Sequence, residues 1–384
     1  MAPQQPTGNN GGVPFRFFDN REKYLLFVTT CSEKWEVAAR VAREMDRLKP
    51  AQPALKVFDA GMGDGTVLTR VMRAMHAKFP TVPFLVVGKE ISLEDVRLSV
   101  EKLPDRFHEH PHTVFVATNL FYYEAAGLML RNADLRDKLN WHVIELDGDN
   151  THGFDHQIRN QIQPILNDGW QTRTSEKTGN PRYVKPTVVV IYRKDHRFSL
   201  DRIIPRPGEA GSEYDLVIAS QPYQARLPAE IKVRNVLGPL SQAIAPGGRM
   251  LTIQSTGKDP GMEIIRKVWP KEKPFRTPRH KLLEALKASP FGEGRGLRYH
   301  AHADSRSLFE YGLHVLPNEV GSNIGTSTLL AAWNAAVYVA QIEDHRLRDV
   351  LAEGKYLDAT QKVLKRHGGL WFVNESFTVS RKAR

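Results

Sequence analysis

The 384-residue sequence contains a single cysteine, Cys31, and this scarcity excludes an internal disulfide. Such a composition fits a reducing compartment, so we expect a cytoplasmic protein. No apolar stretch approaches the ~20 residues that a membrane-spanning helix needs, and the sequence therefore predicts no membrane partner. The start of the chain is polar and glycine-rich and lacks the apolar core of a signal peptide. We expect residues 1–20 to form a flexible tail.

The sequence also lacks metal-ligand motifs, although it contains residues that can bind metals. Five of them crowd into ten residues: Asp147, Asp149, His152, Asp155 and His156. The stretch lacks a tight spacing such as H-E-x-x-H, so the sequence predicts a solvated turn and no metal site. Because histidine titrates near neutral pH, His152 is our candidate for a general base.

Acidic residues are outnumbered, with 43 Asp and Glu against 54 Lys and Arg, which gives a formal net charge of +11. A charge of this sign allows attraction to a polyanion. The basic residues are spread along the chain, with modest clusters at 266–281 and 381–384, and no recognised nucleic-acid module accompanies them. A nucleic-acid partner is therefore an alternative that we do not favour over a solvated basic surface.

Among the features that are present, the most informative is a glycine-rich segment after an apolar run. The run ends at Asp59, and apolar residues return at helical spacing over 67–72. Between them three glycines alternate with other residues: Gly61, Gly63 and Gly65. This order predicts a strand, a tight turn and a helix, the arrangement by which an open α/β sheet presents a nucleotide site. An acid precedes the turn and Asp64 lies inside it, so a cationic ligand suits the site better than a diphosphate.

Three later apolar runs also end in polar residues. The run at 84–88 is followed by Glu90, 25 residues after Gly65, and a carboxylate in that position can accept hydrogen bonds from both hydroxyls of a ribose. The run at 114–117 ends at Asn119, whose carbonyl oxygen is an acceptor. The run at 214–219 is followed by Ser220, Gln221, Pro222 and Tyr223.

At these residues the chain resembles the class I S-adenosylmethionine-dependent methyltransferases, whose first motif is an acid followed by G-x-G-x-G. The resemblance implies that Asp59 and the three glycines surround the methionine part of S-adenosyl-L-methionine. It also implies that Glu90 binds the ribose and that Asn119 accepts a hydrogen bond from the adenine amino group. Each of these roles has an alternative. The glycine loop could bind no cofactor, Glu90 could be a surface glutamate at a strand end, and Asn119 could be an ordinary asparagine at a strand end.

Residues 220–223 resemble the (Asp/Asn/Ser)-Pro-Pro-Tyr motif of amine-directed methyltransferases. The resemblance implies that Ser220 and a backbone carbonyl accept hydrogen bonds from the target NH₂, while Tyr223 stacks on a planar substrate. This chain departs from the pattern because Gln221 stands where the first proline would be. A strand end followed by a loop explains the same residues equally well.

The resemblance covers residues 21–384 and implies an α/β fold: a doubly wound, mostly parallel, seven-stranded Rossmann-like sheet with an antiparallel final strand at 369–379. An insertion at about 141–195 predicts a strand pair with a helix, or a lobe that covers the substrate. A second addition at about 255–368 predicts helices at 281–288, 326–345 and 356–366 and two strands within 299–315. It either caps the pocket or mediates a homodimer. A helical segment at 21–50 precedes the first strand, and Tyr24 and Thr29 are candidates to line a lid.

The sequence thus predicts an enzyme that transfers a methyl group from S-adenosyl-L-methionine to a small-molecule acceptor, in particular to an amine nitrogen. Three alternatives stay open. One is a methyltransferase that acts on RNA or DNA through the basic surface. Another is an aminopropyltransferase-like enzyme, although no acid-rich polyamine pocket is identifiable in the sequence. The third is an inactive scaffold that only binds the cofactor.

Overall fold

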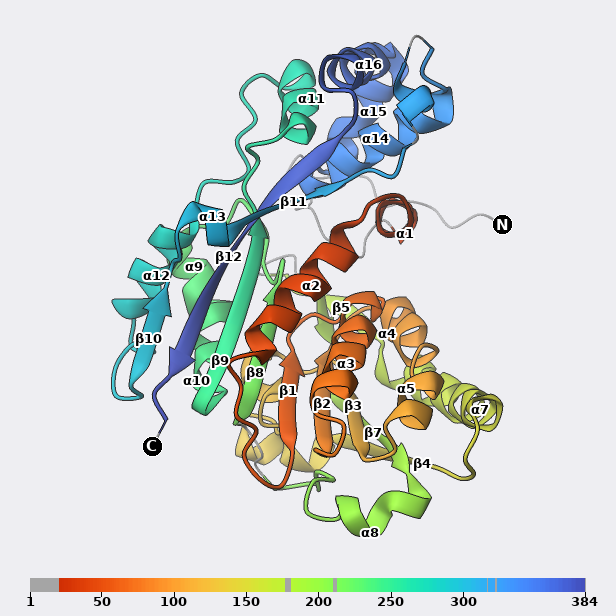
Figure 1. Ribbon diagram of the computed structural model, residues 1–384, viewed down its shortest axis with the longest axis vertical. Coiled ribbons are helices and arrows are strands. Elements are labelled where there is room, and N and C mark those ends of the chain that lie inside the picture. The colour runs from red at the N-terminus through yellow and green to blue at the C-terminus, as the bar shows by residue number, and fades with distance from the viewer. Residues whose placement is uncertain (1–20, 177–180, 210–212, 316, 322, 384) are drawn as a thin grey trace.

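The protein is built around one central sheet. The computed structural model describes residues 21–176, 181–209, 213–315, 317–321 and 323–383. The expected tail at 1–20 lies outside the described residues. The sheet has ten strands in the order β10-β12-β9-β8-β1-β2-β3-β7-β4, and β11 pairs with β12 (Figure 1). Its strands are β1 (Leu55–Asp59), β2 (Phe84–Lys89), β3 (Thr113–Thr118), β4 (Asn140–Leu146), β7 (Thr187–Arg193), β8 (Tyr214–Ser220), β9 (Ile244–Ser255), β10 (Leu297–His300), β11 (Leu308–Gly312) and β12 (Trp371–Arg381).

The centre of the sheet is parallel and confirms the expected doubly wound α/β class. β3, β2, β1, β8 and β9 run side by side in one direction, so their carboxyl ends meet at one edge. β12 is antiparallel to β9, as expected of the final strand. The expected number of seven strands is too low, because β4 and β7 extend the sheet beyond β3 and both β10 and β11 pair with β12.

The insertion contains the expected strand pair with a helix. β4 and β7 are parallel to each other and are joined through α7 (Thr151–Gly169) and a short hairpin of β5 (Thr172–Thr174) and β6 (Pro181–Tyr183). β7 is antiparallel to β3. The carboxyl ends of β4 and β7 therefore point toward the opposite edge of the sheet from those of β1, β2 and β3.

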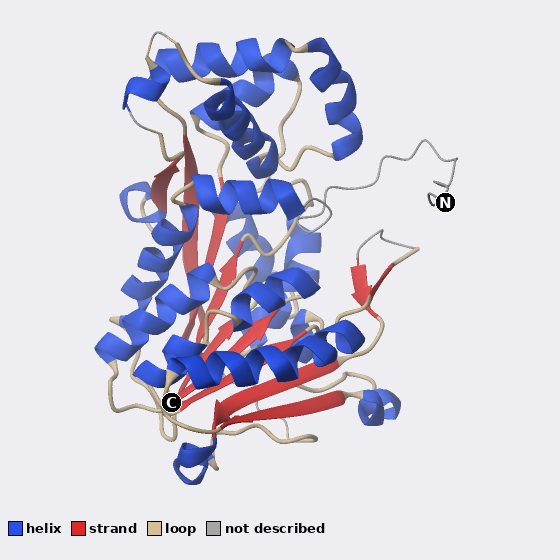
Figure 2. Ribbon diagram, turned by 90° about the vertical axis from the view of Figure 1, so that its right-hand side faces the viewer, coloured by secondary structure: helices blue, strands red, loops and turns tan. Residues whose placement is uncertain are grey.

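Helices cover both faces of the sheet (Figure 2). Apolar residues of one face, such as Val57 and Val86, share a core with helices α2 (Glu33–Met45), α3 (Thr66–Lys78), α4 (Leu93–Val100), α5 (Pro104–Glu109) and α7. The opposite face, which includes Phe58 and Val87, packs against α6 (Tyr122–Ala125), α9 (Ala229–Lys232), the π-helical turn η3 (Val233–Leu237), α10 (Gly238–Gln242) and α12 (Arg279–Lys287). Burial on both faces explains why the central strands are almost continuously apolar.

A separate group of helices, here called the cap, lies beyond the carboxyl ends of the central strands (Figure 1). It consists of α11 (Pro260–Val268), α14 (Thr326–Val339), α15 (Asp344–Glu353) and α16 (Lys355–His367), and it shares an apolar core with α1 (Arg21–Thr30). The helix expected at 326–345 is broken after Val339. At the break Gln341 has φ 54°, and its side chain accepts a hydrogen bond from the N–H of Ala225 (2.8 Å), next to the sequence motif at 220–223.

The remaining short elements are α8 (Arg197–Leu200), α13 (Asp304–Ser307) and the 3₁₀ turns η1 (Ala133–Lys138), η2 (Lys194–His196) and η4 (Pro317–Val320). Cys31 is buried beside α1, and burial raises the pKa of its thiol to about 12, which agrees with an unreactive cysteine. Within the described part of the chain, no helix combines the length and the apolar character needed to span a bilayer.

Candidate functional site

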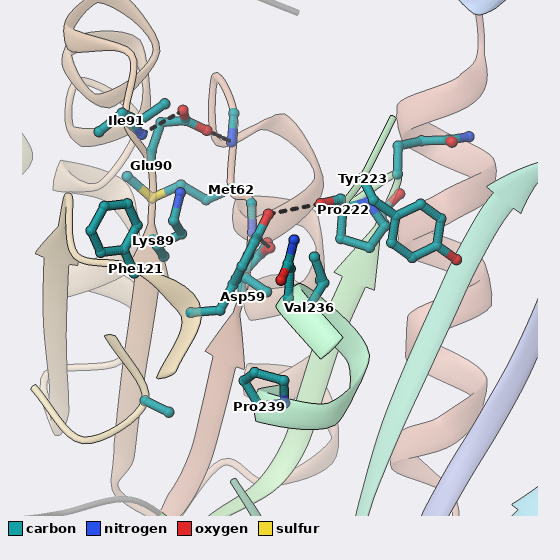
Figure 3. Close-up of a pocket in the computed structure, with 18 of the residues that line it drawn as sticks. Asp59, Met62, Lys89, Glu90, Ile91, Phe121, Pro222, Tyr223, Val236 and Pro239 are labelled. Carbon is teal, nitrogen blue, oxygen red and sulfur yellow. Dashed lines mark hydrogen bonds between the residues drawn. The ribbon is translucent and has the colours of Figure 1, made fainter. Parts of the chain in front are cut away.

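A cavity of about 1360 Å³ opens at the carboxyl ends of the central strands (Figure 3). Side chains that end four of these strands line it: Asp59, Glu90, Asn119 and Ser220. Pockets for single small ligands usually measure ~300–1,000 Å³. The cavity therefore has room for a nucleoside-sized molecule and a second molecule beside it.

The glycine loop at 61–65 forms one wall, and two of its glycines are required by geometry. Gly63 has φ 53° and Gly65 has φ 76°, a region that residues with a Cβ rarely adopt. A Cβ on Gly65 would lie 2.6 Å from the Ser99 hydroxyl, so this glycine allows the loop to pack on α4. A Cβ on Gly63 would lie 2.7 Å from the Tyr24 hydroxyl. Gly61 has open space around its Cα.

Asp59 ends β1 and is only 2% exposed. Its Oδ1 accepts a hydrogen bond from the Gly61 N–H (3.1 Å). The pKa of this carboxyl is raised to about 7, and burial is the main cause. The charge of Glu90 also raises this pKa, whereas the Gly61 hydrogen bond and Lys34 lower it. A buried carboxylate that is costly to ionise gains most from a cation, because the cation compensates the lost hydration.

Glu90 follows β2 and faces the same cavity as Asp59 (Figure 3). Its carboxylate accepts hydrogen bonds from three backbone N–H groups, those of Gly63 (3.0 Å), Ile91 (2.7 Å) and Ser92 (3.0 Å). The side chain thus ties the glycine loop to the loop that leads into α4. Since a carboxylate offers about four acceptor positions, further capacity remains for a hydroxyl group.

Asp64 differs from the expectation that its charge serves a cationic ligand. Lys102 donates to its Oδ2 (2.6 Å), Thr66 bonds the same oxygen, and Tyr24 donates to its Oδ1 (3.0 Å). The pKa of Asp64 is held below its usual range by Lys102 and Lys34 despite the opposing effect of burial. The charge of Asp64 is therefore already compensated by the protein.

Asn119 is buried, and its amide braces two distant segments. Its Nδ2 donates to the carbonyl oxygens of Gly169 and Lys185 (both 2.8 Å), and its Oδ1 accepts from the N–H of Thr187 (2.9 Å). One lone pair of Oδ1 remains, so the adenine contact stays a prediction. This bracing role could not be predicted from the local sequence, because the partners lie 50 or more residues away.

Residues 220–223 line the cavity at the end of β8. Gln221 has φ 48°, which a proline cannot adopt, so the backbone here differs from that of a Pro-Pro motif. The carbonyl of Pro222 accepts a hydrogen bond from the Tyr122 hydroxyl (2.8 Å), visible in Figure 3. Tyr223 is 7% exposed and donates its hydroxyl to Gln254 (2.9 Å). Ser220 and the edge of Tyr223 thus remain candidates to contact an acceptor.

The candidate base His152 lies elsewhere. It is exposed at the start of α7, in a small surface depression formed with Lys102 and Asp105, and is not among the residues that line the cavity. The reason is topological, since β4 points its carboxyl end away from the site and the chain enters α7 from there. The structure therefore places His152 outside the cavity that holds the other candidate residues. Within the described residues no group of three or more His, Cys, Asp or Glu is placed to hold a metal ion.

Many residues of the cavity were not singled out from the sequence as parts of the site, and four of them lie close to the glycine loop or to Glu90. They are Lys89, Asp95, Tyr122 and Lys34. Asp95 lies on α4 and burial raises the pKa of its carboxyl to about 7, with the charge of Glu90 as the second cause. Lys89 directly precedes Glu90, and burial lowers its pKa. Lys89 could have been found from the sequence because it stands next to the motif residue Glu90. No feature of the nearby sequence indicates that Asp95 belongs to the site. Of the two lid candidates, Tyr24 lines the cavity, while Thr29 is exposed and donates to backbone carbonyls of its own helix.

No family model and no curated protein sequence matches the chain. Several solved structures do. A loganic acid methyltransferase with SAH is 9% identical over 97% of this chain and 99% of its own, with a TM-score of 0.42. The cyclopropane synthase MmaA2 from Mycobacterium tuberculosis is 13% identical over 97% of this chain and 100% of its own (TM-score 0.34). The [4+2]-cyclase SpnF is 11% identical over 97% and 89% (TM-score 0.34).

These three similar structures are thus of a methyltransferase, a synthase and a cyclase. At such identities and TM-scores the likenesses carry no statement about activity. The fold itself is established by the strand order and directions of this chain: a doubly wound α/β sheet with an antiparallel final strand and a glycine loop after its first strand.

Proposed function

We propose that the protein is an S-adenosyl-L-methionine-dependent methyltransferase. One observation carries the proposal: Asp59 and Glu90 end adjacent parallel strands and line one cavity, with the glycine loop between them. The proposal would have no basis if the two carboxylates faced separate cavities, or if apolar side chains filled the carboxyl edge of the sheet. The loop leaves its backbone close to the cavity at Gly61, where an added Cβ would have no atom within 4 Å.

The residues of the site fit this cofactor. Asp59, buried and short of a cationic partner, suits the positively charged amino-acid end, and Glu90 suits the ribose hydroxyls. The remaining lone pair of Asn119 suits the adenine amino group. When bound, the cofactor supplies an electrophilic methyl group on its sulfonium. The chain then has to hold the acceptor in line and keep water out, and such positioning contributes several kcal/mol to lowering a barrier.

The acceptor atom we propose is an amine nitrogen. Ser220 supports this choice, because its hydroxyl is at the cavity and can accept a hydrogen bond from an N–H. The left-handed backbone at Gln221 and the bond from Tyr122 to the Pro222 carbonyl make this corner different from a Pro-Pro-Tyr motif. The proposal of a nitrogen therefore rests on the hydrogen-bonding capacity of the Ser220 hydroxyl, and not on the resemblance of residues 220–223 to a Pro-Pro-Tyr motif.

An aminopropyltransferase-like activity is less well supported. Its polyamine substrate is cationic and requires carboxylates beyond the cofactor region. The described carboxylates that line the cavity are Glu33, Asp59, Asp64, Glu90 and Asp95, all on or beside the elements that hold the glycine loop. The other end of the cavity is lined by arginines, which repel a polyamine.

Calorimetric titration with S-adenosyl-L-methionine tests the proposal. The unmodified protein should bind it, and Glu90→Gln should weaken binding about tenfold or more, since a hydrogen bond to a charged group contributes ~1.5–3 kcal/mol. Glu284→Gln is the matched control, because this glutamate is exposed on α12 and outside the cavity. Absence of binding by the unmodified protein would contradict the proposal.

Transfer itself is tested with radiolabelled cofactor and fractionated cell extract. The label should enter a small-molecule fraction in the presence of the protein. Cofactor binding without any labelled product in small molecules, protein or nucleic acid would instead indicate the inactive scaffold.

A further inference from the structure

Three consecutive aromatic residues follow β3 and line the cavity, and each has a cation over its ring. Lys89 lies 5.0 Å from the ring centre of Tyr122. Arg182 lies 6.0 Å from that of Phe121, and Arg131 lies 5.6 Å from that of Tyr123. All six residues line the cavity. Phe121 and Tyr123 stack on each other at 6.0 Å, so the two arginines accompany one aromatic stack.

Neither arginine has a carboxylate partner among the residues that the structure describes. Both are exposed, and both lower the pKa of Tyr123 against the larger effects of burial and Glu124. The carboxylate of Glu124 is nearby but is committed to the Tyr183 hydroxyl (3.0 Å) and to the backbone N–H groups of Phe121 and Arg131 (both 3.4 Å).

The hairpin of β5 and β6 adds a like charge at this place. Arg182 on β6 is paired directly opposite Arg173 on β5, and both side chains are exposed. Like charges directly opposite each other in an antiparallel pair are destabilising. An anion bound beside Arg182 would relieve that repulsion.

The cavity is therefore divided by charge. Its carboxylates lie around the glycine loop, as described above, whereas Arg131, Arg136, Arg182, Arg234 and Arg295 line it elsewhere. Of these five, Arg295 has a described carboxylate partner, Glu213 (3.1 Å). Guanidinium groups bind phosphate and carboxylate through paired hydrogen bonds. Because the other four arginines have no carboxylate partner among the described residues, this end of the cavity is suited to an anionic ligand.

We infer that the acceptor is an anion, and that Arg131 and Arg182 bind its phosphate or carboxylate group beside the stack of Phe121 and Tyr123. The inference rests on the proposed function, because it names the acceptor class of the same site. The aromatic stack suits an acceptor with a flat part next to its charge. The same phosphate chemistry is present in a free nucleotide and in a single strand of nucleic acid, and the experiment separates these sources.

The test measures binding and does not depend on turnover. The unmodified protein, saturated with S-adenosylhomocysteine, is titrated calorimetrically with pyrophosphate and with citrate as compact anions. The double variant Arg131→Gln/Arg182→Gln should bind the preferred anion about tenfold more weakly. The control Arg202→Gln/Arg348→Gln removes the same charge from exposed positions outside the cavity and should leave the affinity unchanged.

Cofactor affinity, measured in parallel, separates the two proposals. A protein that binds S-adenosyl-L-methionine but neither anion, or whose two double variants lose anion affinity equally, overturns the anionic acceptor and leaves the proposed function intact. A protein that binds no S-adenosyl-L-methionine contradicts the proposed function itself. Thymidine monophosphate and a single-stranded oligothymidylate form the last two arms. Whichever of them loses affinity only in the Arg131→Gln/Arg182→Gln variant identifies the source of the phosphate.

Discussion

The affinity for S-adenosyl-L-methionine should rise with pH between about 5 and 7, because Asp59 attracts a cation only when it is ionised. Its pKa in the free protein is raised to about 7, first by burial and then by the charge of Glu90. A bound cation favours the ionised carboxylate and lowers this pKa, so binding releases a proton. Affinity is therefore lost as the pH falls below 7 and levels off above it.

The size of the effect follows from the two protonation states of Asp59. At pH 7 about half of the free molecules carry the ionised form, and at pH 5 about one in a hundred does. If the cofactor returns the pKa to its ordinary value near 4, the affinity should fall about fiftyfold between these pH values, or ~2.3 kcal/mol. Asp95 has a pKa of similar height in the same cavity, so the measurement is made in an Asp95→Asn background.

The assay is calorimetry at about pH 5, 6 and 7 in buffers of different ionisation enthalpy, which reports affinity and released protons together. Asp59→Asn in the same background should bind more weakly at pH 7 and should show no rise of affinity with pH. A variant that keeps the rise, or a parent protein whose affinity is independent of pH, would refute the assignment of the titration to Asp59.

Four further outcomes are expected. Without ligand, Asp59→Asn should raise the free energy of unfolding by at most ~4 kcal/mol at pH 8 and should not raise it at pH 4. The reason is that a carboxyl with a raised pKa in the folded state makes the protein less stable as the pH rises from about 4 to 7. Denaturant titration at the two pH values checks this. Gly63→Val should abolish cofactor binding in the same calorimetric titration, since its Cβ meets a tyrosine hydroxyl at 2.7 Å and φ is 53°. His152→Ala should leave turnover unchanged, and a large loss of kcat would restore this residue as a base. Gln221→Pro should destabilise the fold by ~3 kcal/mol or more, visible as a lower Tm, because proline cannot adopt φ 48° and lacks the N–H that bonds to β9.

The local pattern of the sequence determined the end of the cavity where we propose that the cofactor binds. An apolar run, an acid and alternating glycines dictate strand, turn and helix within about 20 residues, and Asp59 and Glu90 take their places because parallel strands present their carboxyl ends at one edge. The antiparallel last strand and the inserted strand pair with its helix were predictable for the same reason, since each is a short segment with its own periodicity.

Contacts between distant segments were decided only by the tertiary structure. Asn119 is held by residues 50 to 68 positions away, and His152 is directed away from the cavity by the antiparallel pairing of β3 with β7. The helix break at Gln341 reaches Ala225 across 116 positions, and Arg131 and Arg182 lie over the two rings of one aromatic stack. A periodic pattern reports which face of a segment is buried, but it does not report which other segment covers that face. The proposed acceptor end of the cavity is built from such pairings, whereas the proposed cofactor end combines one continuous turn with the carboxyl ends of neighbouring parallel strands.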